Sequence, residues 1–480
     1  MNLDVAAISQ RVEARRRVLL DSTVVRRLGG TTGSEGAYLS PDATTSLLRA
    51  GVAAFHASLR YGEGVVTAAA IVPERDGTVS IHIASSSPGK KPVLFREASA
   101  LIEAAEEAAF SVVGVYAYLP RREYVRLGEV DPAMLFHRAD IQKGARRATP
   151  QAPRRYSDTA AAAGTATGRL GAATGESADT AESAAGAAPD AHSGKNHRGC
   201  LDRESLETLV GRHKLPAELE VGRISELLPE VLTRRKQRVQ AAAVRVGKIV
   251  LDEAEVVRSL EMMAGATRYY LDFETTASPV PEWDGLKPWE HMPMMFSLLE
   301  VEGPPEAPEI RRETVFTPGR ASDPRETLAD RLAEGLVSKH GPIIVFDDGL
   351  ERKVLSSLAG RFEHFAPAAE QIAQRIVDIS TPFRGFFVYH PDQCGKASLK
   401  VLLRIYGDDE YKSLAVADGR LAHDLLAAAA GGMLKAEEEG EVLRRLSTYV
   451  AQDTNSLVTL HGALARLLDD KDAWIPPPSV

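Results

Sequence analysis

The stretch Arg268–Thr275, with the sequence RYYLDFET, combines a short apolar run with two acidic residues, Asp272 and Glu274. Side chains two positions apart on a β-strand point to the same face, so we expect both carboxylates to face one point in space. Paired carboxylates are half of a site for a hard divalent cation, and such sites catalyse phosphodiester chemistry. Because Asp-x-Glu also occurs by chance, the alternative interpretation is two solvated charges at a strand end.

The elements around this strand predict an α/β fold. Strands are expected at RYYLDFE, MMFSLLEVE and RRETVFT, followed by a helix at DPRETLADRLAEGLVSKH, a strand at PIIVFDD and a helix at LERKVLSSLAG. Three strands, a helix, a strand and a helix resemble the order of a ribonuclease H-like fold, a mixed sheet flanked by helices. In that fold the fourth strand adds in parallel beside the first. Ligands are then expected at the strand ends, where Asp272 and Glu274 lie.

A second group of acids follows the expected fourth strand. The sequence PIIVFDDGLERKVL leaves its apolar run at Phe346, which places Asp347, Asp348 and Glu351 at a strand–helix junction beside the first strand. Any of the three could reach a metal ion shared with the first strand. The alternative is that they cap the helix and complement its dipole.

A third acid lies near the end of the chain. In LRRLSTYVAQDTNSLVTL, Tyr449 and Asp453 are four residues apart and therefore share one face of an expected helix. The helix is apolar on both sides of Asp453, so this carboxylate needs a partner. A metal ion would be such a partner.

Composition indicates a folded soluble protein. The chain has 480 residues, 44% of them hydrophobic and 26% charged, which suggests two or three domains. We find neither a membrane-spanning stretch nor a secretory signal, so we expect a cytoplasmic protein without a membrane partner. Two cysteines, Cys200 and Cys394, are too few for an iron–sulfur cluster held by four thiolates. A net charge of −8 neither favours nor excludes nucleic acid, because local charge decides that.

Changes in composition predict four regions. Residues 1–142 are expected to form a small α/β module, with a hairpin across Asp76-Gly77. Residues 143–198 are rich in Ala, Gly, Ser and Thr, which predicts a disordered linker. Residues 199–265 have helical periodicity and are expected to form a connector, and residues 266–470 form the domain around RYYLDFET.

Basic residues gather in the linker opening and in the connector. The first set is Lys143, Arg146, Arg147, Arg154 and Arg155, and the second is Arg234, Arg235, Lys236, Arg238, Arg245 and Lys248. Both sets could touch phosphates. The alternatives are a solvated tether and a solvated helical face, respectively.

The acidic motifs together resemble a known signature. LDFET, FDDGLE and YVAQD, in that order, are similar to the three-part signature of the DEDD superfamily of 3′ exonucleases, and the Tyr-x-x-x-Asp form of the last part marks its tyrosine branch. YHPDQCGKASLKVLL and the region after LDFET further resemble a bacterial family of unassigned function. In that family a DEDD-type domain follows a PD-(D/E)XK nuclease-like domain. The first module here lacks that motif's acidic pair and lysine, which implies a degenerate PD-(D/E)XK-like module.

The resemblance also implies roles for particular residues. It implies Tyr449 as the residue that positions or deprotonates water, and as metal ligands Asp272, Glu274, Glu351 and Asp453. The family usually has Asn and Phe where Asp347 and Leu350 stand, so the second acidic ligand stays open among Glu351, Asp347 and Asp348. Oxygen ligands favour two ions of Mg²⁺ or Mn²⁺. Lys396 and Lys400 could meet a substrate phosphate or lie on a surface helix.

These observations predict a metal-dependent 3′–5′ exonuclease that hydrolyses phosphodiester bonds by two-metal-ion catalysis. Its expected partner is DNA or RNA with a free 3′ end. The alternative is a catalytically inactive nucleic-acid-binding or scaffold protein with two decayed nuclease folds. Sugar discrimination depends on contacts to one hydroxyl group, so the sequence leaves open the choice between DNA and RNA, as well as strandedness, pathway and oligomeric state.

Overall fold

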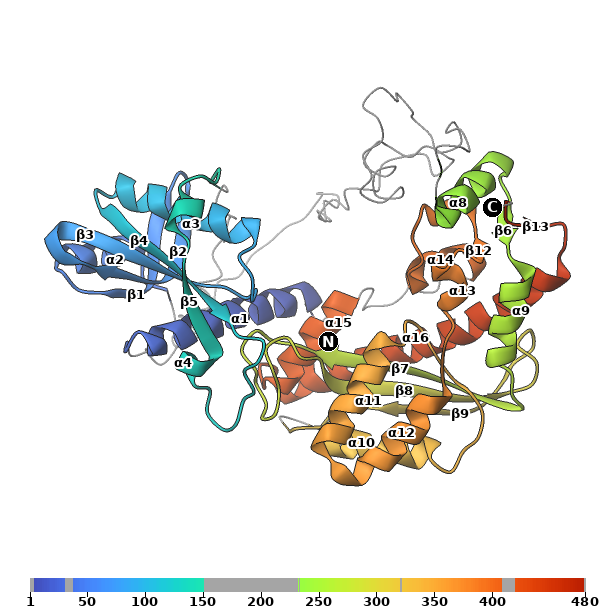
Figure 1. The fold of residues 1–480 in the computed structure, drawn as a ribbon. Helices are drawn as coiled ribbons and strands as arrows, with labels where there is room; N and C mark the ends of the chain where they lie inside the picture. Colours follow the sequence, from blue (N-terminus) through green and yellow to red (C-terminus); the bar gives the residue numbers. More distant parts are fainter. Residues whose placement is uncertain are drawn as a thin grey trace, which may run out of the picture. The chain divides into compact units, whose positions relative to one another are not determined.

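The computed structural model describes residues 4–30, 38–150, 232, 234–319, 322–407 and 419–478. The chain divides into two compact units, whose elements are labelled in Figure 1. The N-terminal unit holds the described residues up to 150 together with Thr276–Met292. The C-terminal unit holds the described residues from 232 to Thr275 and from Pro293 onward. None of the described helices combines the length and the apolar character needed to cross a bilayer.

The N-terminal unit is built around a five-stranded sheet. Its strands are β1 (Ala54–Tyr61), β2 (Gly64–Pro73), β3 (Thr78–Ala84), β4 (Ser111–Pro120) and β5 (Phe136–Asp140), paired in that order. Its helices are α1 (Val5–Arg27), α2 (Pro41–Arg49), α3 (Pro92–Glu107), α4 (Pro132–Leu135) and α5 (Gln142–Ala145). β3 and β4 are parallel because α3 connects them, and the other neighbours are antiparallel. The expected hairpin joins β2 to β3 through a 3₁₀ turn in which Gly77 has φ 74°.

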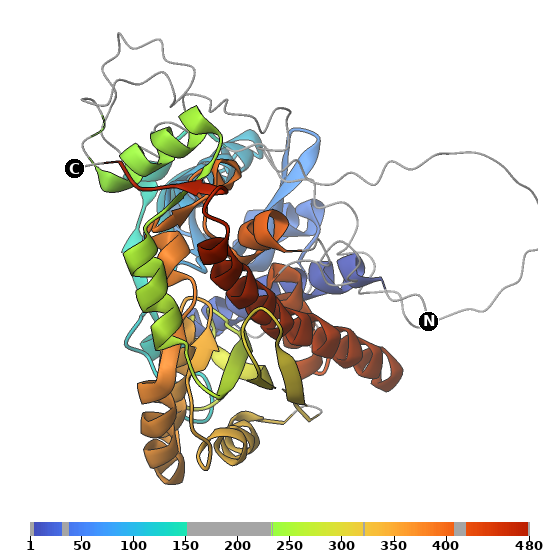
Figure 2. The ribbon, with the colours of Figure 1, turned by 90° about the vertical axis from the view of Figure 1, so that its right-hand side faces the viewer.

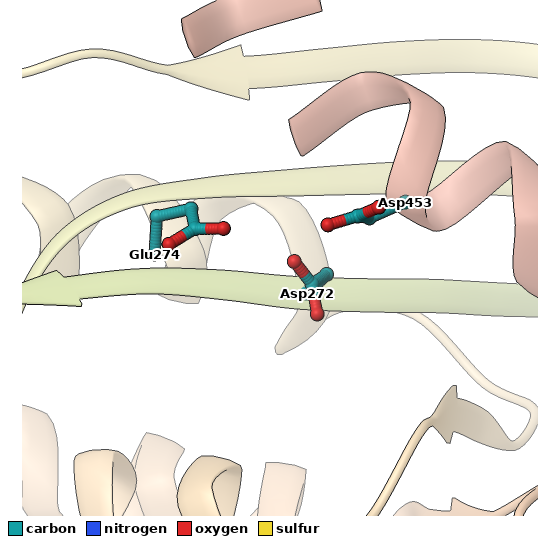
Figure 3. Close-up of side chains that lie close together, drawn as sticks. All are labelled: Asp272, Glu274 and Asp453. Carbon is teal, nitrogen blue, oxygen red and sulfur yellow. The ribbon is translucent and has the colours of Figure 1, made fainter. Parts of the chain in front are cut away.

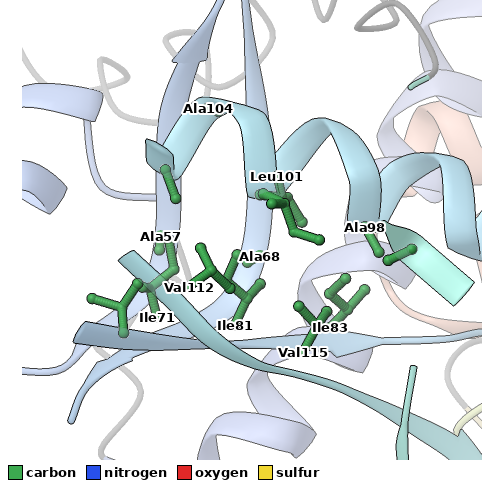
Figure 4. Packing of buried hydrophobic residues seen from close by; sticks show 14 of the residues in the cluster. Ala57, Ala68, Ile71, Ile81, Ile83, Ala98, Leu101, Ala104, Val112 and Val115 are labelled. Carbon is green, nitrogen blue, oxygen red and sulfur yellow. The ribbon is translucent and has the colours of Figure 1, made fainter. Parts of the chain in front are cut away.

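Small residues let α3 pack closely on this sheet. In Figure 4, Ala98, Leu101 and Ala104 of α3 face apolar side chains of the strands, among them Ile81 and Val115. Ala68, Ala69 and Ala70 of β2 and Ile83 of β3 belong to this unit's buried core. Packing alone therefore accounts for the residue types at these positions.

The first residues of the region predicted as a linker, 143–198, are folded as part of the N-terminal unit. α5 spans Gln142–Ala145, Ala145 is fully buried, and the Arg146 guanidinium donates to the carbonyl oxygen of Val112. Arg146 also pairs with Glu106, so it holds the end of the unit and is not a solvated tether. The prediction was wrong for these residues because composition counts large apolar residues, whereas one buried alanine and the contacts of one arginine are enough to hold a single helical turn. The rest of the linker, from residue 151, lies outside the described residues.

The C-terminal unit has a second five-stranded sheet and a small three-stranded one. The strands are β6 (Ile249–Leu251), β7 (Thr267–Thr276), β8 (Met292–Glu302), β9 (Glu309–Phe316), β10 (Ile343–Val345), β11 (Ile376–Asp378), β12 (Val388–Tyr389) and β13 (Trp474–Ile475). The helices are α8 (Arg235–Val246), α9 (Glu253–Met262), α10 (Arg325–Leu336), α11 (Gly349–Arg361), α12 (Ala366–Arg375), α13 (Thr381–Arg384), α14 (Leu399–Tyr406), α15 (Gly419–Ala430) and α16 (Ala436–Asp469). Short 3₁₀ turns lie at Glu363–Phe365 and Pro391–Gln393.

The large sheet has the order β11-β10-β7-β8-β9. β10 pairs in parallel with β7, with Ile344 opposite Tyr270, which confirms that the fourth strand of this region adds beside the first. β8 and β9 are antiparallel, and β10 and β11 are parallel. Apolar residues of α10, α11 and α12 cover one face of the sheet, and residues of α9, α14 and α16 share a core with the other face. α16 is the long red helix in Figure 2.

Two expected regions of this half need correction. The connector predicted at 199–265 is not wholly helical, because β6 lies within it and pairs with β12 and β13. The part of the connector before residue 232 lies outside the described residues. The domain predicted at 266–470 is interrupted, because Thr276–Met292 belongs to the N-terminal unit. Val280 of this segment is buried in the same apolar cluster as Leu20 and Phe136.

Candidate metal centre

Strict alternation along β7 places the two acids of RYYLDFET on the face that contacts α16. Leu271 and Phe273 pack in the core with α10, α11 and α12, whereas Tyr270 packs in the core that includes α16. Asp272 and Glu274 share the face of Tyr270, because side chains two apart on a strand point the same way.

Two buried hydrogen bonds fix α16 against this face. The Tyr270 hydroxyl lies 2.8 Å from Nδ1 of His461, and the Ser297 hydroxyl of β8 lies 2.8 Å from that of Thr454. Burial lowers the pKa of His461 to about 4, so this imidazole is neutral near pH 7. Asp453 precedes Thr454 in the helix, so these bonds set the height and rotation at which its carboxylate meets β7. We did not select either pair from the sequence.

Asp272, Glu274 and Asp453 come together as predicted. One carboxylate oxygen from each of the three lies within 4.8 Å of one from each of the others. Figure 3 shows the side chains of the β7 acids and of Asp453 on α16 turned toward one another. Asp453 therefore meets two acids of β7 that lie almost two hundred residues earlier in the chain. Two solvated charges at a strand end would not bring a distant acid to the same point.

The environment of these carboxylates strongly opposes their negative charge. Burial raises the pKa of Asp272 well above its ordinary value of 3.8, and repulsion from Asp453, Glu274 and Glu351 raises it further. Burial also raises the pKa of Glu274 to about 8, with a contribution from Asp453. Without a cation, the cluster is held together only if part of it is protonated. A bound cation removes that need by compensating the charge.

Glu351 lies beside this group. Its side chain, in the first turn of α11, is 2% exposed, and its Oε2 atom has no hydrogen-bond partner among the described residues. Burial raises the pKa of Glu351 to about 8, and its charge in turn raises the pKa of Asp272. Glu351 is not within the 4.8 Å group, so the structure brings together three of the four predicted ligands and places the fourth as a neighbour.

The other two acids considered for this position have different partners. Asp347, which has φ 64°, is exposed and pairs with Arg384, while Asp348, the N-cap residue of α11, pairs with Arg352 of that helix. The backbone N–H of Asp347 donates to Asp378. Of the three candidates that the sequence left open, Glu351 is therefore the buried one.

Tyr449 and Lys400 lie next to the carboxylates. Tyr449 is 3% exposed and lies one helical turn before Asp453 on α16, as predicted. The Nζ atom of Lys400, on α14, is 5.9 Å from the centre of the Tyr449 ring. Lys396 is exposed in the loop before α14 and has no such contact with the ring.

His423 of α15 was not predicted from the sequence. Its Nδ1 atom lies 3.1 Å from the carbonyl oxygen of Thr275, the residue after Glu274. The sequence around His423 contains no recognisable motif, so only the structure identifies it as a neighbour of the acidic group.

Most basic residues of the connector have structural partners. Arg235 pairs with Asp252 and lies over the ring of Phe387, and Lys248 donates to the carbonyl oxygen of Asp472. These contacts favour a structural role over the phosphate-facing surface that we considered.

The donor set fits a hard divalent cation. All its ligand atoms are carboxylate oxygens, as Mg²⁺ and Mn²⁺ prefer, and the described residues hold no His–Cys cluster at this point that would favour zinc. The unpaired Oε2 of Glu351 is a further buried acceptor directed at no protein donor in the described part of the chain.

Part of the C-terminal half matches the model of a protein family. Residues 269–398 match the family model of a domain of unknown function (DUF2779). The matched segment contains Asp272, Glu274 and Glu351 but ends before Tyr449 and Asp453. No curated protein matches the chain.

Proposed function

We propose that this protein is a metal-dependent 3′–5′ exonuclease that hydrolyses phosphodiester bonds. The observation that carries the proposal is the meeting of Asp272, Glu274 and Asp453 within 4.8 Å, next to the buried Glu351. The order β9-β8-β7-β10-β11, with β10 parallel to β7, supports a ribonuclease H-like fold for the C-terminal unit.

Each residue has a task in this proposal. Asp272, Glu274 and Asp453 would hold two ions of Mg²⁺ or Mn²⁺, with Glu351 as the fourth carboxylate. The chemistry that these ions supply when bound is activation of water and stabilisation of charge on the phosphate and on the leaving oxygen. Tyr449 orients the attacking water by hydrogen bonding, because a phenol that keeps its proton is a poor general base.

The N-terminal unit contributes no chemistry in this proposal. Its core strands carry alanine and isoleucine at the positions where a nuclease of related layout needs acids, as Ala68 and Ile83 illustrate. In this proposal the N-terminal unit has a binding or a structural role.

Three measurements on the purified full-length chain test the proposal. With Mn²⁺, single-stranded DNA and RNA labelled at the 5′ end should give ladders that shorten from the 3′ end, and a blocked 3′ end should prevent this. Asp272→Asn should abolish the activity, whereas Asp330→Asn, which changes an exposed acid on α10, should retain it. Mn²⁺ should also raise the melting temperature of the unmodified protein but not that of Asp272→Asn, because the ion binds only the folded state.

Two outcomes would refute the proposal. Equal activity in Asp272→Asn and the unmodified protein would place the activity at another site or in a contaminant. Absence of both activity and a Mn²⁺-dependent thermal shift would favour the inactive nucleic-acid-binding or scaffold protein.

A further inference from the structure

Lys400 is a cation placed beside an anionic cluster. It lies in the first turn of α14 and is half-buried, and its Nζ atom is 5.9 Å from the ring centre of Tyr449. The N-terminal end of a helix carries partial positive charge, which adds to the charge of the lysine in the same direction. Positive potential therefore lies next to the residue that we propose to orient water.

The charge of Lys400 reaches the carboxylates themselves. Lys400 and Asp453 are both charged groups that act on Glu274, and the charge of Lys400 is opposite in sign to that of Asp453. Lys396 differs, because its charge acts on Cys394 in the loop before α14. Of the two lysines expected near substrate, Lys400 is the one with an electrostatic connection to the site.

Charge balance explains what such a cation is for. Four ionised carboxylates and two divalent cations sum to zero, so a phosphodiester would bring an uncompensated negative charge into a half-buried site. One lysine at this position compensates that charge. A lysine does not help hold the metal, because like charges repel.

We propose that Lys400 binds the phosphodiester group that is cleaved and compensates its negative charge. Lys400 then neither holds the metal nor serves packing alone. This inference rests on the proposed exonuclease function. It predicts that a variant without the charge of Lys400 changes two affinities in opposite directions: substrate binding should become weaker and metal binding stronger.

The experiment compares Lys400→Met, Lys400→Arg and Lys353→Met in the full chain. Methionine keeps most of the apolar stem over Tyr449, arginine keeps the charge, and Lys353 is an exposed lysine of α11 that serves as control. Mn²⁺ affinity is measured by calorimetry without nucleic acid. Binding of fluorescein-labelled (dT)10 and (rU)10 is measured by anisotropy in Ca²⁺, and KM and kcat are measured in Mn²⁺.

Lys400→Met should raise the Kd for the oligonucleotides and the KM roughly tenfold while it tightens Mn²⁺ binding roughly threefold, since a half-exposed charge is partly screened. Lys400→Arg should stay within about twofold of the unmodified protein in all measurements, as should Lys353→Met. A packing role would instead leave Lys400→Met close to normal and disturb Lys400→Arg, and that result would overturn the inference. Weaker Mn²⁺ binding in Lys400→Met would also overturn it.

The failures of the two proposals are distinguishable. If the unmodified protein binds Mn²⁺ and degrades nucleic acid, but Lys400→Met changes neither KM nor Mn²⁺ affinity, only the role of Lys400 is wrong. If the unmodified protein neither binds Mn²⁺ nor acts on nucleic acid, both proposals are wrong.

Discussion

The metal-free protein should lose stability as the pH rises, and Glu351 is the residue that shows this most clearly. Its side chain is 2% exposed, and burial raises its pKa from 4.5 to about 8. Below pH about 4.5 the carboxyl group is protonated in both the folded and the unfolded chain. Above that pH the unfolded chain ionises freely while the folded chain keeps the proton, so the unfolded state binds fewer protons and stability falls until the pH passes about 8.

The size of the effect follows from the pKa difference. Each pH unit between the two pKa values changes the free energy of unfolding by about 1.4 kcal/mol for one group. Between pH about 5 and about 7.5, Glu351 alone should therefore reduce the stability of the metal-free protein by about 3 kcal/mol. Asp272 acts in the same direction, because burial and the neighbouring carboxylates raise its pKa as well.

Urea unfolding in EDTA across this pH range, followed by tryptophan fluorescence, measures the effect. The quantity of interest is the difference in slope between the unmodified protein and Glu351→Gln, which has no ionisable group at this position. Glu363→Gln, which changes an exposed glutamate, is the matched control and should keep the slope of the unmodified protein. Saturating Mn²⁺ should remove most of the slope. Parallel curves for Glu351→Gln and the unmodified protein would refute the assignment of Glu351 to this buried acidic site.

Three further results are expected. In a single-turnover assay, Tyr449→Phe should lower the rate of cleavage about tenfold while Asp272→Asn abolishes cleavage, because the tyrosine only orients water. An equal loss in both variants would contradict that role. Thr454→Val removes the hydroxyl that pairs with Ser297 and should cost about 1–2 kcal/mol in urea unfolding, and an unchanged midpoint would show that this bond does not stabilise α16. Val280→Asp places a charge in an apolar core and should cost more than about 3 kcal/mol, so a variant with a normal melting temperature would contradict the placement of this segment.

The sequence predicts those features that depend on local periodicity. The alternation of RYYLDFET places Asp272 and Glu274 on one face, and the helical spacing places Tyr449 and Asp453 on one face. Both relations need only the geometry of one element. The parallel addition of β10 beside β7 also agrees with the prediction, because the order of elements restricts the topology.

Features that depend on distant partners could not be predicted in this way. β6 has three residues and β12 has two, which is too few for a periodic pattern. They are strands because β6 pairs with both β12 and β13, which lie far along the chain. The choice among three acids after β10 depends on Arg384, which lies far along the chain and draws Asp347 outward. The sequence around Glu351 contains no local pattern that shows which of the three acids is buried.

The segment Thr276–Met292 starts two residues after Glu274 and folds with the N-terminal unit. Arg126 accepts and donates backbone bonds with Gly285 and Leu286, its side chain donates to the carbonyl oxygen of Pro281, and the Trp289 indole donates to Ser86. In the order of the described residues, the polypeptide therefore changes from one unit to the other three times. Neither unit can therefore be removed by a single cut in the chain without also breaking the other unit, so a shortened protein that keeps only one of them should not fold as that unit does here.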